Sequence, residues 1–256
     1  MNPTIETIAQ LLKELKLKHL AQAMLAELPA LAPTEQTVIL RHLGRWSETE
    51  KSERQMLLIQ SRVRNARFPR IETVDKFDFT YNKSTKSIER PYLNLHHNLA
   101  KDRLPSAVFC GDAGLGKTHL ARALGYAACQ KGISTLFTTA AQMVNLLAHA
   151  QKASTLESEL NKYRKPPVLI IDELGYVQMD AQASNLFFQV ISVRHDAASG
   201  TIATTNLPFG KWNQIFANDA IAHAIVDRLV SQAEVFYLEG ESYRGHLRQQ
   251  KARSQK

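Results

Sequence analysis

Residues 111–118 of the chain read GDAGLGKT, and this segment constrains the fold more than any other feature of the sequence. It fits the pattern G-x-x-x-x-G-K-[ST] at every fixed position. An apolar run at 107–110 precedes it, and a helical pattern begins at Lys117. Glycines here let backbone N–H groups turn inward around phosphate oxygens, and a helix start adds partial positive charge. The segment therefore predicts a P-loop between a strand and a helix.

The residue types of this loop suit a nucleoside triphosphate and its metal ion. Lys117 is placed to reach the β- and γ-phosphates, and the Thr118 hydroxyl suits Mg²⁺. His119 fits a packed or hydrogen-bonding helix residue better than a catalytic one. The nucleotide-binding segment comprises Gly111, Asp112, Ala113, Gly114, Leu115, Gly116, Lys117, Thr118 and His119. The alternative is a glycine turn that merely resembles a P-loop.

An acidic pair ends the apolar run at 168–171, farther along the chain. Asp172 is placed to hold Mg²⁺, directly or through water, and Glu173 to orient and deprotonate an attacking water. The plain alternative is a strand that ends in two solvated acids, but the P-loop upstream favours the catalytic interpretation. Glu directly after Asp favours hydrolysis, and this argues against a P-loop kinase that acts on a small metabolite.

Three later residues are candidates for contacts with the γ-phosphate. Asn206 ends the next apolar run, where its amide can bind the phosphate or the attacking water; the alternative is a turn residue before Pro208. Arg228 and Arg244 are considered because an arginine at a γ-phosphate compensates developing charge, even from a neighbouring subunit. On pattern alone, each arginine fits an ordinary surface position better.

The order of patterns predicts an α/β domain behind a helical front. Asn2 and Pro3 open a first helix that Pro29 closes, a second covers 34–46, and a capping box of Ser47 and Glu50 opens a third that ends near 68–69. After Pro69, apolar runs alternate with helical patterns, as in a parallel sheet with crossover helices. Expected strands are 107–110, 133–137, 168–171, 201–204 and 235–238; expected helices are 117–131, two between 139 and 165 with a break near 153–155, and 181–194.

The formal net charge of +8 is unevenly distributed. Residues 1–70 carry 11 basic and 7 acidic side chains, residues 71–241 carry 16 and 17, and residues 242–256 carry five basic and no acidic ones. We therefore expect a basic helical domain at 1–70, an ATPase domain at 71–241 and a basic tail at 242–256. The candidate contacts with DNA phosphates are Arg62, Arg64, Arg67 and Arg70. They form no single helical stripe, and a solvated basic face is the alternative.

Other classes of protein are disfavoured. No run approaches the ~18 apolar residues of a membrane span, and the first ten residues lack a signal-peptide pattern. Cys110 and Cys129 match no zinc-binding spacing and make a poor disulfide framework, so a reducing cytoplasm is expected.

Taken together, the motifs resemble the IstB-like transposition helper ATPases, in the helicase-loader (DnaC/DnaA-like) branch of the AAA+ superfamily. The resemblance covers residues 5–247. The most specific segments are GKTHLARALG at 116–125, IDELGY at 171–176, TTNLPFGKW at 204–212 and IVDRLVSQAEVFYLEGESYR at 225–244, with NARFPRIETVDKFDF at 65–79 ahead of them.

The resemblance implies roles for particular residues. Asn206 would be the sensor-1 residue, Arg228 an arginine finger offered to ATP in the adjacent subunit, and Arg244 a sensor-2 residue of its own subunit. The segment 77–79 would help enclose the base. Because 18 residues follow Leu238, the helical lid of a full AAA+ module is expected to be reduced or absent.

The resemblance also implies a function. With ATP and Mg²⁺, a bacterial cytoplasmic protein of this kind would oligomerise on duplex DNA, bend it with little sequence preference, and recruit a partner transposase. Hydrolysis would drive release. One alternative is a DnaC-like replicative helicase loader, which the long match before residue 70 disfavours. Another is a DNA-binding scaffold that binds ATP without turning it over.

Overall fold

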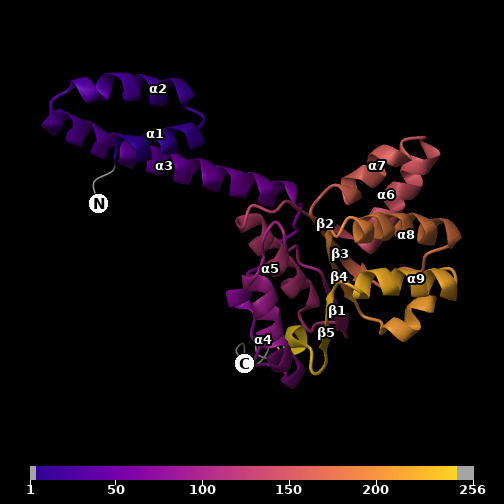
Figure 1. Ribbon diagram of the computed structural model, residues 1–256. Coiled ribbons are helices and arrows are strands. Elements are labelled where there is room, and N and C mark those ends of the chain that lie inside the picture. Colours follow the sequence, from indigo (N-terminus) through magenta and orange to yellow (C-terminus); the bar gives the residue numbers. More distant parts are fainter. Residues whose placement is uncertain (1–3, 247–256) are drawn as a thin grey trace, which may run out of the picture. The chain divides into compact units, whose positions relative to one another are not determined.

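The computed structural model describes residues 4–246, and the chain forms two compact units that divide between Ser61 and Arg62. The α-helices are α1 (Ile5–Glu14), α2 (Lys18–Glu27), α3 (Pro33–Asn65), α4 (Lys83–His97), α5 (Lys117–Gln130), α6 (Ala140–Lys152), α7 (Leu156–Arg164), α8 (Ala181–Asp196) and α9 (Asp219–Val230) (Figure 1). The strands are β1 (Ala107–Gly111), β2 (Thr135–Thr139), β3 (Val168–Leu174), β4 (Gly200–Thr205) and β5 (Glu234–Leu238), with 3-10 turns η1 (Leu28–Ala30), η2 (Val74–Lys76) and η3 (Phe209–Gln214).

The first unit contains α1, α2 and most of α3. The single helix expected up to Pro29 is wrong, because the chain turns at Lys16, which has φ +62°. The N–H of Leu17 closes this turn on the carbonyl of Leu12 at 2.9 Å, an end typical of a left-handed helix cap. The turn lets α1 and α2 bury their apolar faces against each other, with Ile8 and Met24 in the shared core.

Two further expectations concern the first 70 residues. The separate second and third helices are wrong, and the expected cap at Asn2 stays a prediction. The second and third helices are one continuous helix, α3, and Ser47 caps nothing because it is a buried residue in mid-helix. A cap needs an extended residue, and no proline interrupts the chain here to provide one. The expected cap Asn2 lies outside the described residues, and Thr4 caps α1 by accepting from the N–H of Thr7.

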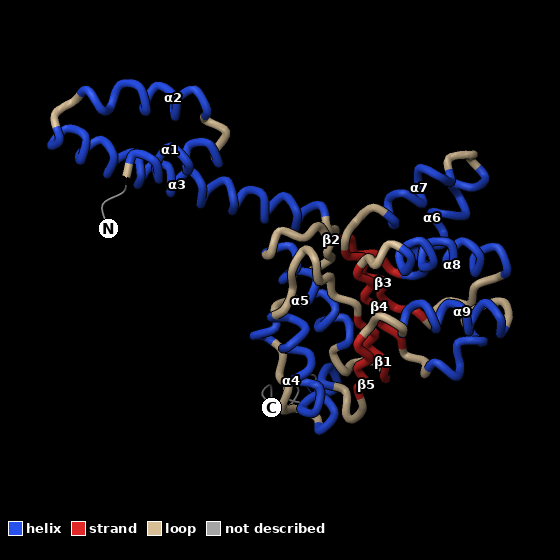
Figure 2. The backbone as a smooth tube through the Cα atoms, in the orientation of Figure 1, coloured by secondary structure: helices blue, strands red, loops and turns tan. Residues whose placement is uncertain are grey.

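The second unit is built on a sheet of five parallel strands in the order β2-β3-β4-β1-β5 (Figure 2). Successive side chains of β3 alternate between its two faces, as a strand requires. Ile170 packs in the core beneath α4 and α5, whereas Leu169 and Ile171 pack beneath α6, α7, α8 and α9. The result is a three-layer α/β/α arrangement, so the expected parallel sheet with crossover helices is confirmed.

The expected elements of this unit agree well with the structure. The break near 153–155 separates α6 from α7, with Ser154 at φ +56°, and Gly132 ends the turn after α5 at φ +83°. One strand begins later than expected: β2 starts at Thr135 and not at Ile133. The N–H of Ile133 donates instead to the carbonyl of Ala128 at the end of α5. No helix within residues 4–246 is both long and apolar enough to cross a membrane.

Candidate nucleotide-binding site

The glycine-rich loop lies at the carboxyl end of β1 and leads directly into α5. Gly114 and Gly116 have φ of +85° and +92°, which turn the backbone around a concave space. The Lys117 ammonium points back into the loop and donates to the carbonyls of Gly111 and Asp112 at 2.6 and 2.7 Å. Burial is the main cause that lowers its pKa. The loop thus presents a cation and helix-start N–H groups to an anion.

Asp172 lies at the end of β3 with its carboxylate almost fully buried. Its Oδ1 accepts from the hydroxyls of Thr118 at 2.8 Å and Thr204 at 2.6 Å, and its Oδ2 lies 3.6 Å from Nη2 of Arg122. Sequence reasoning missed both Thr204 and Arg122. The spacing of Thr118 and Arg122, four residues apart on α5, was the available signal, since such residues share a helix face.

This donor set fits Mg²⁺. The Thr118 hydroxyl and the Asp172 carboxylate are hard oxygen ligands on adjoining elements. No cluster of three His, Cys, Asp or Glu side chains able to hold a metal occurs in the part of the chain that the structure describes. Mg²⁺ in nucleotide sites commonly takes one or two protein oxygens and completes its shell with waters and phosphates. When bound, it would supply positive charge to the phosphate oxygens.

Glu173 follows Asp172 in a conformation that is rare for a residue with a side chain. Its φ is +62°, the pairing of β3 with β4 is irregular between Ile171 and Leu174, and its N–H donates to Oγ1 of Thr204 at 3.0 Å. Such backbone is unfavourable unless neighbours hold it, and it is concentrated at functional sites. Thr204 therefore holds both acids, and the Glu173 side chain remains exposed beside the buried Asp172.

Asn206 lies just beyond β4, the strand next to β3. Its Oδ1 is buried and has no hydrogen-bond partner within residues 4–246. Gly175, at φ +115°, makes the position possible, because a Cβ there would lie 2.5 Å from that oxygen. Buried polar atoms normally have partners, so this acceptor suits a donor that the protein itself does not supply, such as a water.

The segment after β5 lies against the P-loop. The N–H of Tyr243 donates to the carbonyl of Gly114 at 3.1 Å, and the Ser242 side chain occupies the space where a Cβ of Gly114 would be. Arg244 follows in a short helical turn and is exposed; its charge, after burial, helps to lower the pKa of Lys117. The structure thus brings Arg244 to the loop, although only a single turn of helix follows β5 within the described residues.

The segment before α4 contacts the other side of the loop. The Phe77 ring packs where a Cβ of Gly116 would be, and it lies 5.4 Å from the His119 ring. His119 Nε2 is 2.8 Å from the carbonyl of Thr73, and Nδ1 is 3.5 Å from Glu72. His119 is therefore a residue that attaches this segment to α5, which agrees with its reading as a hydrogen-bonding helix residue.

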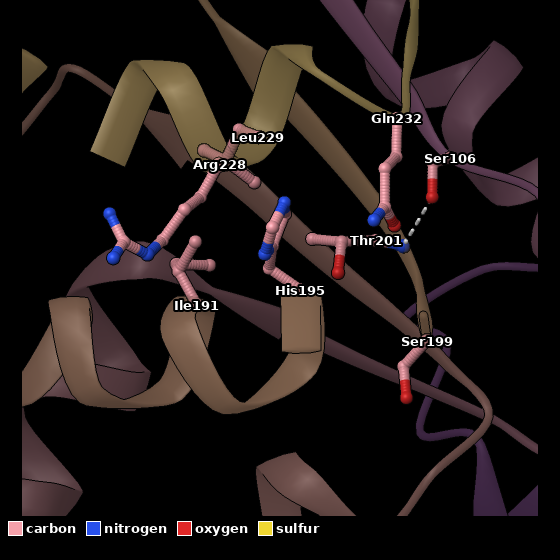
Figure 3. A pocket seen from close by; sticks show the side chains of 8 residues that line it. All are labelled: Ser106, Ile191, His195, Ser199, Thr201, Arg228, Leu229 and Gln232. Atoms are coloured by element: carbon pink, nitrogen blue, oxygen red, sulfur yellow. Dashed lines mark hydrogen bonds between the residues drawn. The ribbon is translucent and has the colours of Figure 1, made fainter. Parts of the chain in front are cut away.

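Arg228 lies at the opposite end of the sheet from the P-loop. It extends from α9 along α8, and the small pocket beside it is lined by Ser106 and Thr201, at the amino ends of β1 and β4 (Figure 3). Its guanidinium lies 4.8 Å from the centre of the Phe188 ring and donates to the carbonyl of Ala224 at 3.2 Å. The structure therefore does not bring Arg228 to the other site residues of the same chain.

The four basic residues proposed for DNA lie in different surroundings. Arg62 lies beside Gly132 after α5, and Arg64 is exposed in the last turn of α3. Arg67 has φ +60°, and Arg70 lies 4.0 Å from Glu72. As expected, they form no single stripe.

The backbone at Gly111 gives a stability prediction. Gly111 has φ +148°, and a Cβ there would lie 2.0 Å from the carbonyl oxygen of Leu238 in β5. Because neither backbone can move without parting β1 from β5, Gly111→Ala should cost about 1–3 kcal/mol and lower Tm by roughly 2–12 °C in calorimetry. Gly210→Ala is the control, since nothing lies within 4 Å of its Cβ position. Equal Tm values for the two variants would contradict the clash.

The parallel sheet, P-loop and acidic pair together define a P-loop nucleotide-binding protein of AAA+ fold. The chain belongs to the family of IstB-like ATP binding proteins, whose model matches residues 10–253. It is 39% identical over 84% of its length to the ATP-binding protein of insertion sequence IS5376 from Geobacillus stearothermophilus, of which it covers 83%. It is 34% identical to that of IS232 from Bacillus thuringiensis over 95% of this chain and 96% of the relative.

Solved structures share the fold. The crystal structure of the DnaC helicase loader superposes with a TM-score of 0.58 at 22% identity, covering 65% of this chain and 96% of that one. AMPPCP-bound DnaA from Aquifex aeolicus superposes with a TM-score of 0.56 at 17% identity, covering 71% of this chain and 55% of that one. The expected AAA+ core is thereby confirmed.

Proposed function

We propose that this chain is an ATP-hydrolysing regulator of transposition that assembles on duplex DNA. Head-to-tail contact between subunits would join the P-loop of one to Arg228 of the next. The assembly would recruit and stimulate a partner transposase. Relatives named as insertion-sequence ATP-binding proteins support the association with transposition. The basic Arg62, Arg64, Arg67 and Arg70 are the proposed DNA contacts, so binding should weaken strongly with salt.

The position of Arg228 carries this proposal. The P-loop follows the carboxyl end of β1, whereas Arg228 lines a small pocket that Ser106, just before the amino end of β1, also lines. A strand of five residues spans about 16 Å, which exceeds the reach of an arginine side chain. Arg228 is nevertheless held in place by Phe188 and the Ala224 carbonyl. An arginine fixed at this distance suits a nucleotide bound by another subunit.

The other residues then have distinct tasks in hydrolysis. Lys117 would leave its loop carbonyls for the β- and γ-phosphates, and Thr118 with Asp172 would hold Mg²⁺. Glu173 would accept a proton from the attacking water, which Asn206 would help to orient. Loss of the γ-phosphate removes what Arg228 binds across the interface. Hydrolysis would therefore loosen the assembly and release DNA.

The oligomeric state with nucleotide tests this proposal. Light scattering should give a monomer or small species with ADP, a larger species with ATP, and the largest with ATP and duplex DNA. Lys117→Ala is the control, because it removes the phosphate-binding cation and should stay small with ATP. A monomer under all three conditions would refute the assembly through Arg228.

A pull-down separates transposition from helicase loading. The ATP-bound protein is incubated with the transposase of the same insertion sequence and, separately, with a replicative hexameric helicase. We expect retention of the transposase. Retention of the helicase alone would instead assign the chain to helicase loading.

The ring beneath Arg228 gives a further prediction. Phe188→Leu removes the ring whose centre lies 4.8 Å from the Arg228 guanidinium. A cation–π contact of this kind contributes about 0.6–2 kcal/mol, so ATP turnover at saturating ATP should fall about 3- to 30-fold. Phe188→Tyr retains the face and should restore most of the turnover. ATP affinity, measured with a fluorescent analogue, should be the same in both variants. Equal turnover of Leu and Tyr variants would show that the ring does not position Arg228.

A further inference from the structure

Arg122 lies at the nucleotide site, but the proposed hydrolysis gives it no task. It follows Thr118 by four residues on α5, so both side chains lie on the helix face toward the end of β3. Its Nη2 lies 3.6 Å from Oδ2 of Asp172, whereas the Thr118 hydroxyl donates to Oδ1 at 2.8 Å. The two side chains of α5 therefore lie next to different oxygens of one carboxylate.

The Asp172 carboxylate needs a positive charge beside it, because it is buried and a buried carboxylate is unfavourable without one. Arg122 forms its ion pair. Lys117 is close enough for the two charges to interact: burial lowers the pKa of Lys117, and the charge of Asp172 opposes this shift. One buried carboxylate therefore interacts with two cations.

The contacts of Arg122 hold it beside Asp172 without fixing it there. The separation of 3.6 Å is too long for a hydrogen bond, and Nε is buried with no hydrogen-bond partner within residues 4–246. The guanidinium lies 4.9 Å from the centre of the Phe137 ring in β2. The face of a ring attracts a cation but takes no hydrogen bond that would fix its position. The guanidinium can therefore shift when another cation comes to Asp172.

We propose that Arg122 is the counter-ion of Asp172 and competes with Mg²⁺ for this carboxylate. The inference rests on the metal site proposed above, but not on hydrolysis, assembly or DNA binding. Arg122 acts through Asp172 and is in this sense a positioning residue. Its charge opposes a divalent cation held by Thr118 and Asp172, so it lowers the affinity of the site for the ion. The phosphates of a nucleotide offset this effect, so the ion binds together with the nucleotide.

Thermal unfolding of the full-length chain in EDTA tests the pairing without metal or nucleotide. Arg122→Gln should lower Tm by about 3–8 °C, because it leaves a buried carboxylate without its counter-ion. In an Asp172→Asn background, which lacks that charge, the same substitution should lower Tm by less than about 2 °C. Equal losses in the two backgrounds would overturn the role of counter-ion.

Nucleotide binding tests the competition. The probe is a fluorescent ADP analogue, titrated in Mg²⁺ and in EDTA. The ratio of its dissociation constants in EDTA and in Mg²⁺ measures how much the ion strengthens binding. Arg122→Gln should raise this ratio about 5- to 30-fold, whereas Arg122→Lys keeps the charge and should stay within about twofold of the wild type.

Arg164→Gln is the matched control for both experiments. The Arg164 side chain is 19% exposed, against 18% for Arg122, and it pairs with Glu157 at 3.0 Å, but it belongs to α7. It should leave the ratio unchanged, and its effect on Tm should not depend on Asp172.

The remaining outcomes separate this inference from the proposed function. An unchanged ratio in Arg122→Gln would overturn the competition, and a lower ratio would show that Arg122 instead orients Asp172 as a ligand. An ADP affinity independent of Mg²⁺ in both proteins would remove the metal site and this inference with it. A chain that neither turns over ATP nor assembles on DNA would contradict the proposed function, yet both expected results could still be obtained.

Discussion

Arg228→Ala should lower ATP turnover by about 10³- to 10⁵-fold while leaving ATP affinity nearly unchanged. The guanidinium lies over the Phe188 ring of α8 and contacts none of the other site residues, so its removal leaves the P-loop, Asp172 and Glu173 of the same chain intact. On the proposed function, what would be lost is charge compensation at the γ-phosphate of a neighbouring subunit. Steady-state phosphate release, with ATP binding measured separately, checks both expectations.

Mixing variants shows whether this arginine acts between subunits. Lys117→Ala lacks the phosphate-binding cation but keeps Arg228; Arg228→Ala has the opposite defect. Only the P-loop of Arg228→Ala and the Arg228 of Lys117→Ala can form a nucleotide-filled interface, so an equimolar mixture should recover up to about half of wild-type turnover. A mixture as inactive as its components would place the action of Arg228 within one chain.

Glu173→Gln should reduce hydrolysis by about 10²- to 10⁴-fold, because the amide cannot accept the proton of the attacking water. The substitution keeps size and shape, and the Glu173 N–H bond to Thr204 does not involve the side chain. ATP should still bind, so the variant should remain assembled on DNA. Single-turnover phosphate release and DNA retention after ATP addition measure the two effects.

One control variant makes that result specific. Asp180 is also an acidic residue, but it caps α8 outside the nucleotide site. Asp180→Asn should therefore leave the rate of hydrolysis near that of the wild type. Unchanged phosphate release in Glu173→Gln would show that another group is the base. Equally slow release from the wild type would instead favour a scaffold that binds ATP without turning it over.

Local pattern predicted the elements of the AAA+ core well, because each signal there has a local cause. Gly132 marks the end of α5 through its positive φ, and the buried run of β3 ends in Asp172 whatever the rest of the chain does. The helix boundaries of residues 5–65 were harder to predict from the sequence. Whether α1 stops at Glu14 depends on α2 folding back to cover Ile8, which is a tertiary contact that no single segment encodes.

In the candidate site, sequence reasoning singled out the charged residues and missed the residues that contact them. Lys117, Asp172 and Glu173 stand out because charged groups at strand ends imply chemistry. Thr204 holds both acids through its hydroxyl, and Phe188 supports Arg228 by its ring; both are common residues of strand and helix interiors. Their roles exist only once β3 lies beside β4 and α8 beside α9, so spacing along the chain could not reveal them.

The attachments of residues 66–77 also set where this protein can be cut and rejoined. Ala66 binds Phe137, Thr73 binds His119, and Phe77 packs on Gly116, so the segment is fastened from the edge of β2 to the P-loop. A chimera that takes its helical front from a relative should therefore be joined inside α3 near Ser61. A junction at Pro69 would exchange one of these three attachments, that of Ala66, and the transplanted segment would replace part of the second unit.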